Sequence, residues 1–229
     1  MQEHFTQEVD SLKTSLIKMA SIVDEQVEQA IRALETGDIN LCKGIKAKDL
    51  EVDAYDNLIQ TQCENILALF QPMATDLRFI ISSMMVNNQL ERCGDIAVNI
   101  SKRVKRTSEH NALIKESGIL EMALKAKTML KSVIDSFINT NTEIANNVLL
   151  ADEAVDELNK NIFKFLVDKM QVEPALIEPC SHLIVLAKHI ERLADHSTNI
   201  AENVIFYMDS KIVSHMKKFE RHQYNGEVE

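Results

Sequence analysis

The sequence predicts an all-α protein made of two tandem antiparallel three-helix bundles, with six long helices related by an internal repeat. Three observations predict this fold. Apolar residues recur at helical spacing, and they make up 45% of the 229 residues, enough to bury a core. The 5 Gly and 3 Pro are too few for a turn-rich all-β fold. A ten-residue motif occurs twice, which indicates a duplicated unit.

The first half of the chain contains three helical segments separated by short breaks. An apolar stripe covers residues 5–34 and stops at the Gly37-Asp38 pair, which can end one helix and cap the next. A second stripe covers residues 45–70 and is interrupted by Pro72. The third helix is expected over residues 75–106. Helices of about 30 residues are roughly 45 Å long.

The second half repeats this organisation. The fourth helix is expected over residues 119–138, and the capping box Thr140-Asn141-Thr142-Glu143 opens the fifth. Pro174 and Pro179 bracket the next break, and the sixth helix is expected over residues 180–209. The predicted units are a first bundle (1–108), an irregular polar linker (109–118), a second bundle (119–212) and a C-terminal tail (213–229).

The repeat is visible in the residues themselves. The segment ERCGDIAVNI at residues 91–100 reappears 100 residues later as ERLADHSTNI at residues 191–200. Glu, Arg, Asp, Asn and Ile occupy identical positions in both copies. Three long helices per copy, joined by short turns, indicate that each copy is an antiparallel three-helix bundle.

Each predicted bundle has two pairs of carboxylates spaced four residues apart. This spacing places both members of a pair on one face of a helix. One pair lies on the second helix of the bundle and the other on the third. The eight residues are Asp49, Asp53, Glu91 and Asp95 in the first bundle, and Asp152, Asp156, Glu191 and Asp195 in the second.

The two pairs of each bundle lie at equal distances from the turn between their helices. In the first bundle the pairs are centred on residues 51 and 93, equidistant from residue 72. In the second they are centred on residues 154 and 193, and the midpoint falls beside Pro174. Positions equidistant from the turn of an antiparallel hairpin lie side by side. The sequence therefore predicts four carboxylates at one level in each bundle.

Four carboxylates at one level repel one another, since even a single like-charged i,i+4 pair costs about 0.2–0.5 kcal/mol. Hard cations prefer such oxygen ligands. We therefore predict that the eight carboxylates bind metal. A solvated acidic surface is the alternative explanation. It is favoured for any single pair, but not for four pairs in register.

Further residues lie close to the acidic pairs. Arg92 and Arg192 could neutralise part of the negative charge. Asn99 and Asn199 lie one turn beyond the pairs, where they could bind metal through a carbonyl, hold a ligand carboxylate, or serve interhelix packing. Glu202 could join the second site. Its counterpart is Lys102, so the two sites need not be alike.

Three histidines of the sixth helix are not expected to share a metal ion. His182, His189 and His196 are spaced by seven residues, roughly 10 Å of helical rise. They are interpreted as a polar stripe.

Several classes of protein are disfavoured. The net charge of −10 argues against a nucleic-acid partner. No apolar run reaches the ~18 residues of a membrane span, and the first residues lack the layout of a signal peptide. We therefore expect a cytoplasmic protein without membrane insertion. The phosphate-loop, dinucleotide, zincin and hydrolase motifs are absent, as is the Glu-x-x-His of di-iron enzymes.

Two segments resemble the most characteristic stretches of the PhoU family: ERLADHSTNIAE at residues 191–202 and QPMATDLR at residues 71–78. The N-terminal run with Phe5, Leu12, Met19 and AIRAL at residues 30–34 is similar too. The likeness covers about residues 5–208. One departure is Ser101-Lys102, where the family often has Ala-Glu.

The resemblance implies two pseudosymmetric three-helix bundles and multinuclear metal clusters on E(D)xxxD motifs, which map onto the eight carboxylates. Iron is favoured, with Mg, Mn, Zn and Ca as alternatives. It also implies a non-enzymatic regulator that restrains phosphate import and the phosphate-starvation response. Such proteins contact the ATPase of the phosphate ABC transporter (PstB-like) and a sensor histidine kinase (PhoR-like). That places the protein at the inner face of the membrane through its partners, and a homodimer is expected.

Two other functions remain open from the sequence. One is an enzyme, either a metal-dependent phosphatase or a di-iron-type enzyme on a helical bundle. The other is a metal-free helical interaction module. Turnover of phosphoesters would identify the first, and elemental analysis of protein purified without chelator would identify the second.

Overall fold

The structure is a computed structural model that describes residues 2–212, so the predicted tail over residues 213–229 lies outside the described residues. The described part contains six long helices, one short helix and two 3₁₀ turns, and no strand. The helices are α1 (Gln2–Thr36), α2 (Ile45–Phe70), α3 (Thr75–Thr107), α4 (Asn111–Ser117), α5 (Ile119–Asn139), α6 (Thr142–Val172) and α7 (Ile177–Asp209). The all-α fold predicted from the sequence is confirmed.

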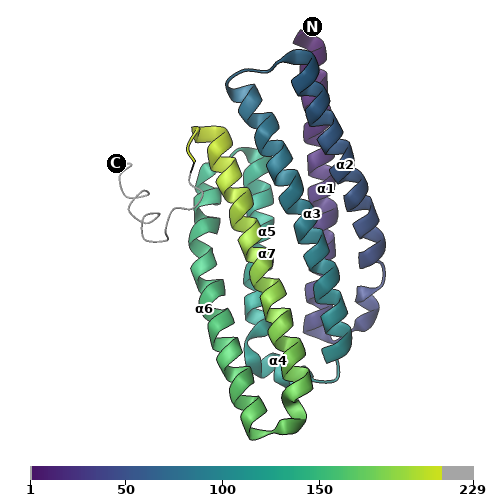
Figure 1. Cartoon of the computed structure of the whole chain (residues 1–229), viewed down its shortest axis with the longest axis vertical. Coiled ribbons are helices and arrows are strands. Elements are labelled where there is room, and N and C mark those ends of the chain that lie inside the picture. The colour runs from purple at the N-terminus through teal and green to yellow at the C-terminus, as the bar shows by residue number, and fades with distance from the viewer. Residues whose placement is uncertain (1, 213–229) are drawn as a thin grey trace, which may run out of the picture.

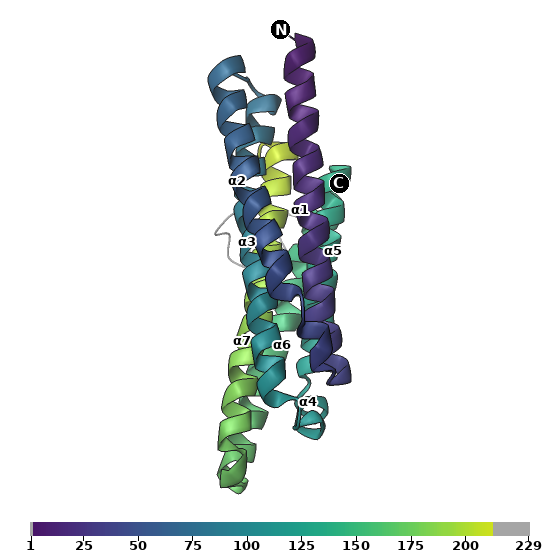
Figure 2. The same cartoon turned by 90° about the vertical axis from the view of Figure 1, so that its right-hand side faces the viewer.

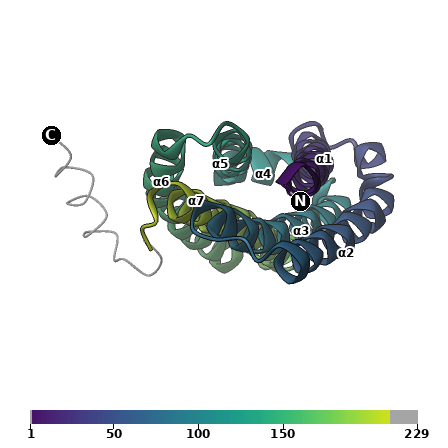
Figure 3. The ribbon, with the colours of Figure 1, turned by 90° about the horizontal axis from the view of Figure 1, so that it is seen from above.

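The two repeats form two bundles that lie side by side. Helices α1, α2 and α3 pack on one another, as do α5, α6 and α7 (Figure 1). The bundles are offset along the long axis, with the start of α1 at one end and the start of α7 at the other (Figure 2). Seen from above, α6, α7, α3 and α2 form a curved row, with α5 and α1 behind it (Figure 3). The equivalent helices α3 and α7 therefore form the main seam between the repeats.

The apolar stripe of the first predicted helix becomes the centre of the first bundle. Leu12, Leu16, Met19, Val23 and Val27 of α1 are each at most 1% exposed. The stripe fits a helix because its steps of three and four keep one face apolar. The helix ends where Gly37 adopts φ 72°, a left-handed conformation that suits glycine.

The register of α2 against α3 matches the one predicted about Pro72. Asn87 Nδ2 donates to Asp56 Oδ1 at 2.6 Å and to the Asp56 carbonyl oxygen at 3.2 Å. Residues 56 and 87 are almost equidistant from residue 72, as an antiparallel hairpin requires. This places the acidic pairs of the two helices beside each other.

The structure corrects the predicted linker. Residues 111–117 form α4, a short helix that buries Leu113 and Ile114 against the second bundle. This burial explains why the segment is helical despite its polar composition. Gly118, at φ 82°, joins α4 to α5.

Two predicted helix starts also change. Thr140 ends α5 in a left-handed conformation, and Asn141, rather than Thr140, caps α6 by accepting from the Ile144 N–H. The last helix begins at Ile177, three residues before the predicted start, with Pro179 in its first turn. Proline is tolerated there because the first N–H groups of a helix have no intrahelical partner.

Candidate metal sites

The first acidic site lies across α2 and α3. Asp49 and Glu91 are half-buried, whereas Asp53 and Asp95 are exposed. Loss of hydration raises the pKa of Asp49, a hydrogen bond from Gln26 lowers it, and the charges of Asp95 and Asp53 raise it further. Asp95 belongs to α3 and Asp49 to α2, so the effect of the Asp95 charge on Asp49 agrees with the predicted common level.

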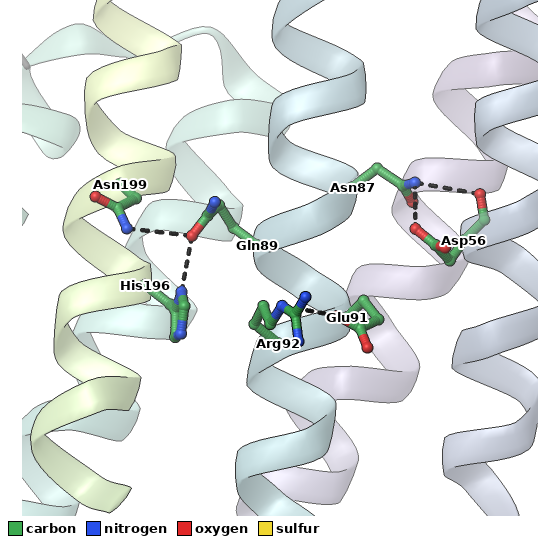
Figure 4. Close-up of polar contacts among 7 residues, drawn as sticks. All are labelled: Asp56, Asn87, Gln89, Glu91, Arg92, His196 and Asn199. Atoms are coloured by element: carbon green, nitrogen blue, oxygen red, sulfur yellow. Dashed lines mark hydrogen bonds and ion pairs between the residues drawn. The ribbon is translucent and has the colours of Figure 1, made fainter. Parts of the chain in front are cut away.

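A fifth carboxylate, that of Asp56, lies near enough to Glu91 to affect its pKa. Loss of hydration raises its pKa, the neighbouring Arg92 lowers it, and the charges of Asp95, Asp56 and Asp53 raise it. Arg92 Nε lies 3.4 Å from Glu91 Oε2, with the Asn87–Asp56 contact one turn away along α3 (Figure 4). Asp56 was not singled out in the sequence, although its position three residues after Asp53 puts it near the same face of α2.

The second acidic site lies across α6 and α7. Asp152 is 7% exposed, Asp156 and Glu191 are half-buried, and Asp195 is exposed. Loss of hydration, followed by the charges of Asp152 and Glu191, raises the pKa of Asp195 to about 6. Lys188 forms an ion pair with Glu191 and opposes this rise. All eight predicted residues therefore lie in two clusters, each on its predicted pair of helices.

Neighbouring carboxylates are not yet a coordination sphere. Within residues 2–212, no three Asp, Glu, His or Cys side chains converge closely enough to hold a metal ion. Mutual repulsion and the pairing of Glu91 with Arg92 and of Glu191 with Lys188 oppose such convergence. The helices bring the donors together, and rotation of the side chains would be needed to close them around an ion.

The donor set and its surroundings fit a hard cation. Carboxylate oxygens are the ligands that such ions prefer. Beside Asp49, the amide oxygen Oε1 of Gln26 is buried and has no hydrogen-bond partner among the described residues. A Cβ atom on Gly94 would lie 3.1 Å from that oxygen, so the missing side chain leaves room there. The first site therefore has a spare oxygen and the space beside it.

Gln26 was not identified from the sequence as a site residue. A signal was present, because Gln26 follows Val23 by three residues and precedes Ala30 by four, on the apolar face of α1. Its side chain is 0% exposed. A polar residue on a buried helical face is the pattern that could have identified it.

The additional candidate residues have their own contacts. Asn99 Oδ1 accepts from Lys102 Nζ at 3.3 Å, and Asn199 Nδ2 donates to Gln89 Oε1 at 3.2 Å. Glu202 lines a groove between α3 and α7. Arg192 lies on α7 with His189 and His196, and its charge contributes to lowering the pKa of both.

The predicted histidine stripe lines the contact between the repeats. His182 Nδ1 lies 3.0 Å from Arg103 Nη1. Figure 4 shows the second contact, in which His196 Nδ1 lies 2.7 Å from Gln89 Oε1. Loss of hydration, then the charges of Arg192 and Arg92, lower the pKa of His196 to about 4. His196 is therefore neutral near pH 7 and serves as a hydrogen-bonding group of the seam.

Sequence comparison identifies relatives over nearly the whole chain. A family model described as the PhoU domain matches residues 16–104 and 119–204, one match in each repeat. A phosphate-specific transport system accessory protein PhoU homolog from Caulobacter vibrioides is 34% identical over 211 residues, 90% of this chain and 92% of the relative. A homolog with the same description from Clostridium acetobutylicum is 32% identical over 212 residues, 91% and 96% of the two chains.

Solved structures agree with these matches. The crystal structure of PhoU from Pseudomonas aeruginosa superimposes with a TM-score of 0.84 at 28% identity, covering 90% of this chain and all of the other. The phosphate transport system regulatory protein PhoU from Streptococcus pneumoniae gives a TM-score of 0.83 at 28% identity, covering 92% and 99%. These are the names of accessory and regulatory proteins rather than enzymes, in agreement with the non-enzymatic expectation.

Proposed function

Because the chain belongs to the PhoU family, we propose that it is a non-enzymatic regulator that restrains phosphate uptake and phosphate-starvation signalling. The observation that carries this proposal is the family match in both repeats, together with relatives named for the phosphate-specific transport system. The proposed partners are the ATPase of the phosphate ABC transporter and a sensor histidine kinase, contacted at the inner face of the membrane. Within residues 2–212, no helix has the length and apolarity to cross a bilayer.

We further propose that the two acidic sites bind metal. Asp49, Asp53, Glu91 and Asp95 would hold it in the first repeat, and Asp152, Asp156, Glu191 and Asp195 in the second. The raised pKa values of Asp49, Glu91 and Asp195 support this, because carboxylates of both helices contribute to each rise after loss of hydration, which is the largest cause. Bound metal would supply positive charge and a fixed coordination geometry, with iron as the favoured element.

The chain's own residues give this proposal a mechanism. Each site joins two neighbouring helices of its bundle, α2 to α3 or α6 to α7. When their carboxylates are neutralised, the two helices no longer repel at that level and their relative register is held. The curved row α6–α7–α3–α2 in Figure 3 then presents a fixed surface to a partner. Metal would in this way act on partner binding without any reaction at the site.

The metal proposal is tested by removing ligands from one site at a time. The variant Asp53→Ala/Glu91→Ala should lose the metal of the first site and keep that of the second, as measured by elemental analysis of protein purified without chelator. Asp156→Ala/Glu191→Ala is the matched control and should show the reverse. Full stoichiometry in the first variant would refute the assignment, and metal-free unsubstituted protein would favour a helical interaction module without metal.

The regulatory proposal is tested in cells. Deleting the chain should raise phosphate uptake and expression of phosphate-starvation genes at high phosphate, and the unsubstituted chain should restore both. A pull-down at high and low phosphate should recover the transporter ATPase and the kinase, and light scattering should show a homodimer. Recovery of neither partner under either condition would contradict the proposed contacts.

A further inference from the structure

Gln26 of α1 lies beside Asp49, a residue of the first acidic site. Its side chain is 0% exposed. Its amide nitrogen Nε2 donates to the Ile45 carbonyl oxygen at 3.0 Å and lies 3.5 Å from Asp49 Oδ1. Its amide oxygen Oε1 is buried and makes no hydrogen bond to any described residue. Half of the amide is therefore used to position the residue, and the other half is unsatisfied.

A buried carbonyl oxygen without a partner destabilises a folded protein, because its hydration is lost and nothing replaces it. The second repeat avoids this cost. The 103-residue offset that relates Asp49 to Asp152 takes Gln26 to Met129, which is 3% exposed and apolar. An apolar residue therefore suits this place in the bundle, and the first repeat has a glutamine there instead.

Gly94 keeps the space beside this oxygen open. A Cβ atom on Gly94 would lie 3.1 Å from Gln26 Oε1 and 3.4 Å from Asp49 Oδ1. Both oxygens therefore lie close to Gly94, which belongs to the same turn of α3 as the ligand candidates Glu91 and Asp95. In the second repeat, Ala194 occupies the corresponding position.

We infer that Gln26 is an additional oxygen ligand of the first metal site, reaching it from a third helix through the space left by Gly94. This inference rests on the proposed metal binding. Amide oxygens are neutral donors that hard divalent cations accept alongside carboxylates, Ca²⁺ and Mn²⁺ among them. The first site therefore has a neutral oxygen donor that the second lacks, and the two sites differ in affinity for such cations.

Mn²⁺ binding to isolated sites tests the inference. Asp152→Asn/Asp195→Asn disables the second site, so free Mn²⁺ followed by electron paramagnetic resonance reports the first site alone. In this background Gln26→Met, which copies the second repeat, should weaken Mn²⁺ binding about tenfold or more, the range seen when groups supporting a metal site are lost. Gln26→Glu loses the Nε2 donor to the Ile45 carbonyl oxygen but keeps an oxygen donor for the ion, so it should bind Mn²⁺ more tightly than Gln26→Met.

A second variant leaves Gln26 intact. Gly94→Ala places a methyl group against Oε1 and should also weaken Mn²⁺ binding at the first site. The reverse background, Asp53→Asn/Asp95→Asn, is the control, and Gln26→Met should leave the second site's affinity unchanged there. A structural role alone would change the melting temperature of metal-free protein but not the increase produced by Mn²⁺.

The outcomes separate the two proposals. First-site affinity within about twofold of the parent in Gln26→Met would overturn the role of Gln26 while leaving the metal sites standing. Absence of Mn²⁺ binding in the parent at either site would overturn the metal proposal, and the inference with it. Equal weakening at both sites would also overturn the inference, because it would show a general loss of packing.

Discussion

The two repeats have the same helices in the same order, but they pack them with different residue types. Around the first acidic site the interior contains Gln26, the Asn87–Asp56 hydrogen bond and Gly94. With an offset of 103 residues for the first two helices and 100 for the third, the second repeat has Met129, Asn159, Ala187 and Ala194 at those places. The first site is thus supported mainly by polar groups, whereas three of the four counterparts in the second repeat are apolar and Asn159 alone is polar.

The outer surfaces of the repeats differ in the same sense. In the first repeat an ion pair between Glu25 and Lys48 spans α1 and α2. The counterparts are Thr128 and Ala151, which cannot pair. They line an apolar groove of about 770 Å³ between α5 and α6. Duplication preserved the helical plan, while each copy acquired its own interior and its own surface.

The largest difference in stability between matched variants of the two repeats is expected at the Asn87–Asp56 hydrogen bond of the first repeat. Asn87→Ala removes a buried donor to the Asp56 carboxylate, and hydrogen bonds to charged groups contribute about 1.5–3 kcal/mol. The free energy of unfolding, measured with urea, should fall by about 2 kcal/mol. Asn159→Ala, at the counterpart of Asp56, should change it by less than about 0.5 kcal/mol. Equal losses would show that the two interfaces are alike after all.

A smaller, pH-dependent effect is expected in the second repeat. The pKa of Asp195 is raised to about 6 in the folded protein, above its ordinary value of 3.8, so ionisation destabilises the fold. Asp195→Asn should therefore stabilise metal-free protein above pH 6. The gain should shrink as the pH falls below 6 and disappear below 3.8, where the Asp195 carboxyl is protonated in both the folded and the unfolded state. Because Asp195 is exposed, screening limits the gain to about 1 kcal/mol or less.

Thermal unfolding of both proteins between pH 4 and pH 8 measures this effect. The difference between variant and parent is the relevant quantity, since the lowered pKa of His196 makes the parent less stable as the pH falls. A constant difference across this range would contradict the raised pKa. Saturating Mn²⁺ should reverse the sign above pH 6, because the parent alone keeps the complete ligand set.

The smallest effect is expected at the surface. Lys48→Ala removes the ion pair with Glu25, whose side chain is 59% exposed, and exposed pairs contribute at most about 1 kcal/mol. The loss in the free energy of unfolding should be below 1 kcal/mol and should shrink further at high salt. A loss of several kcal/mol, or one that salt does not change, would contradict the interpretation of this contact as a solvent-exposed ion pair.

Local patterns predicted most of the fold. The apolar stripes gave the long helices to within about three residues at their ends, because the burial of one face is recorded in residue spacing. The pairing of α2 with α3 followed from the breaks at Pro72 and from equal distances along the chain. The short helix α4 was not predicted, since its stability depends on burying Leu113 and Ile114 against helices distant in sequence.

What the sequence determined by itself was the repeat, the antiparallel register and therefore the level of the eight carboxylates, because spacing along a helix fixes both face and height. Only the tertiary structure decided how those carboxylates are surrounded. The spare oxygen of Gln26, the space beside Gly94 and the histidine seam between α3 and α7 arise where helices from different parts of the chain meet. The distances between such groups depend on how closely the helices pack, which no pattern along a single helix records.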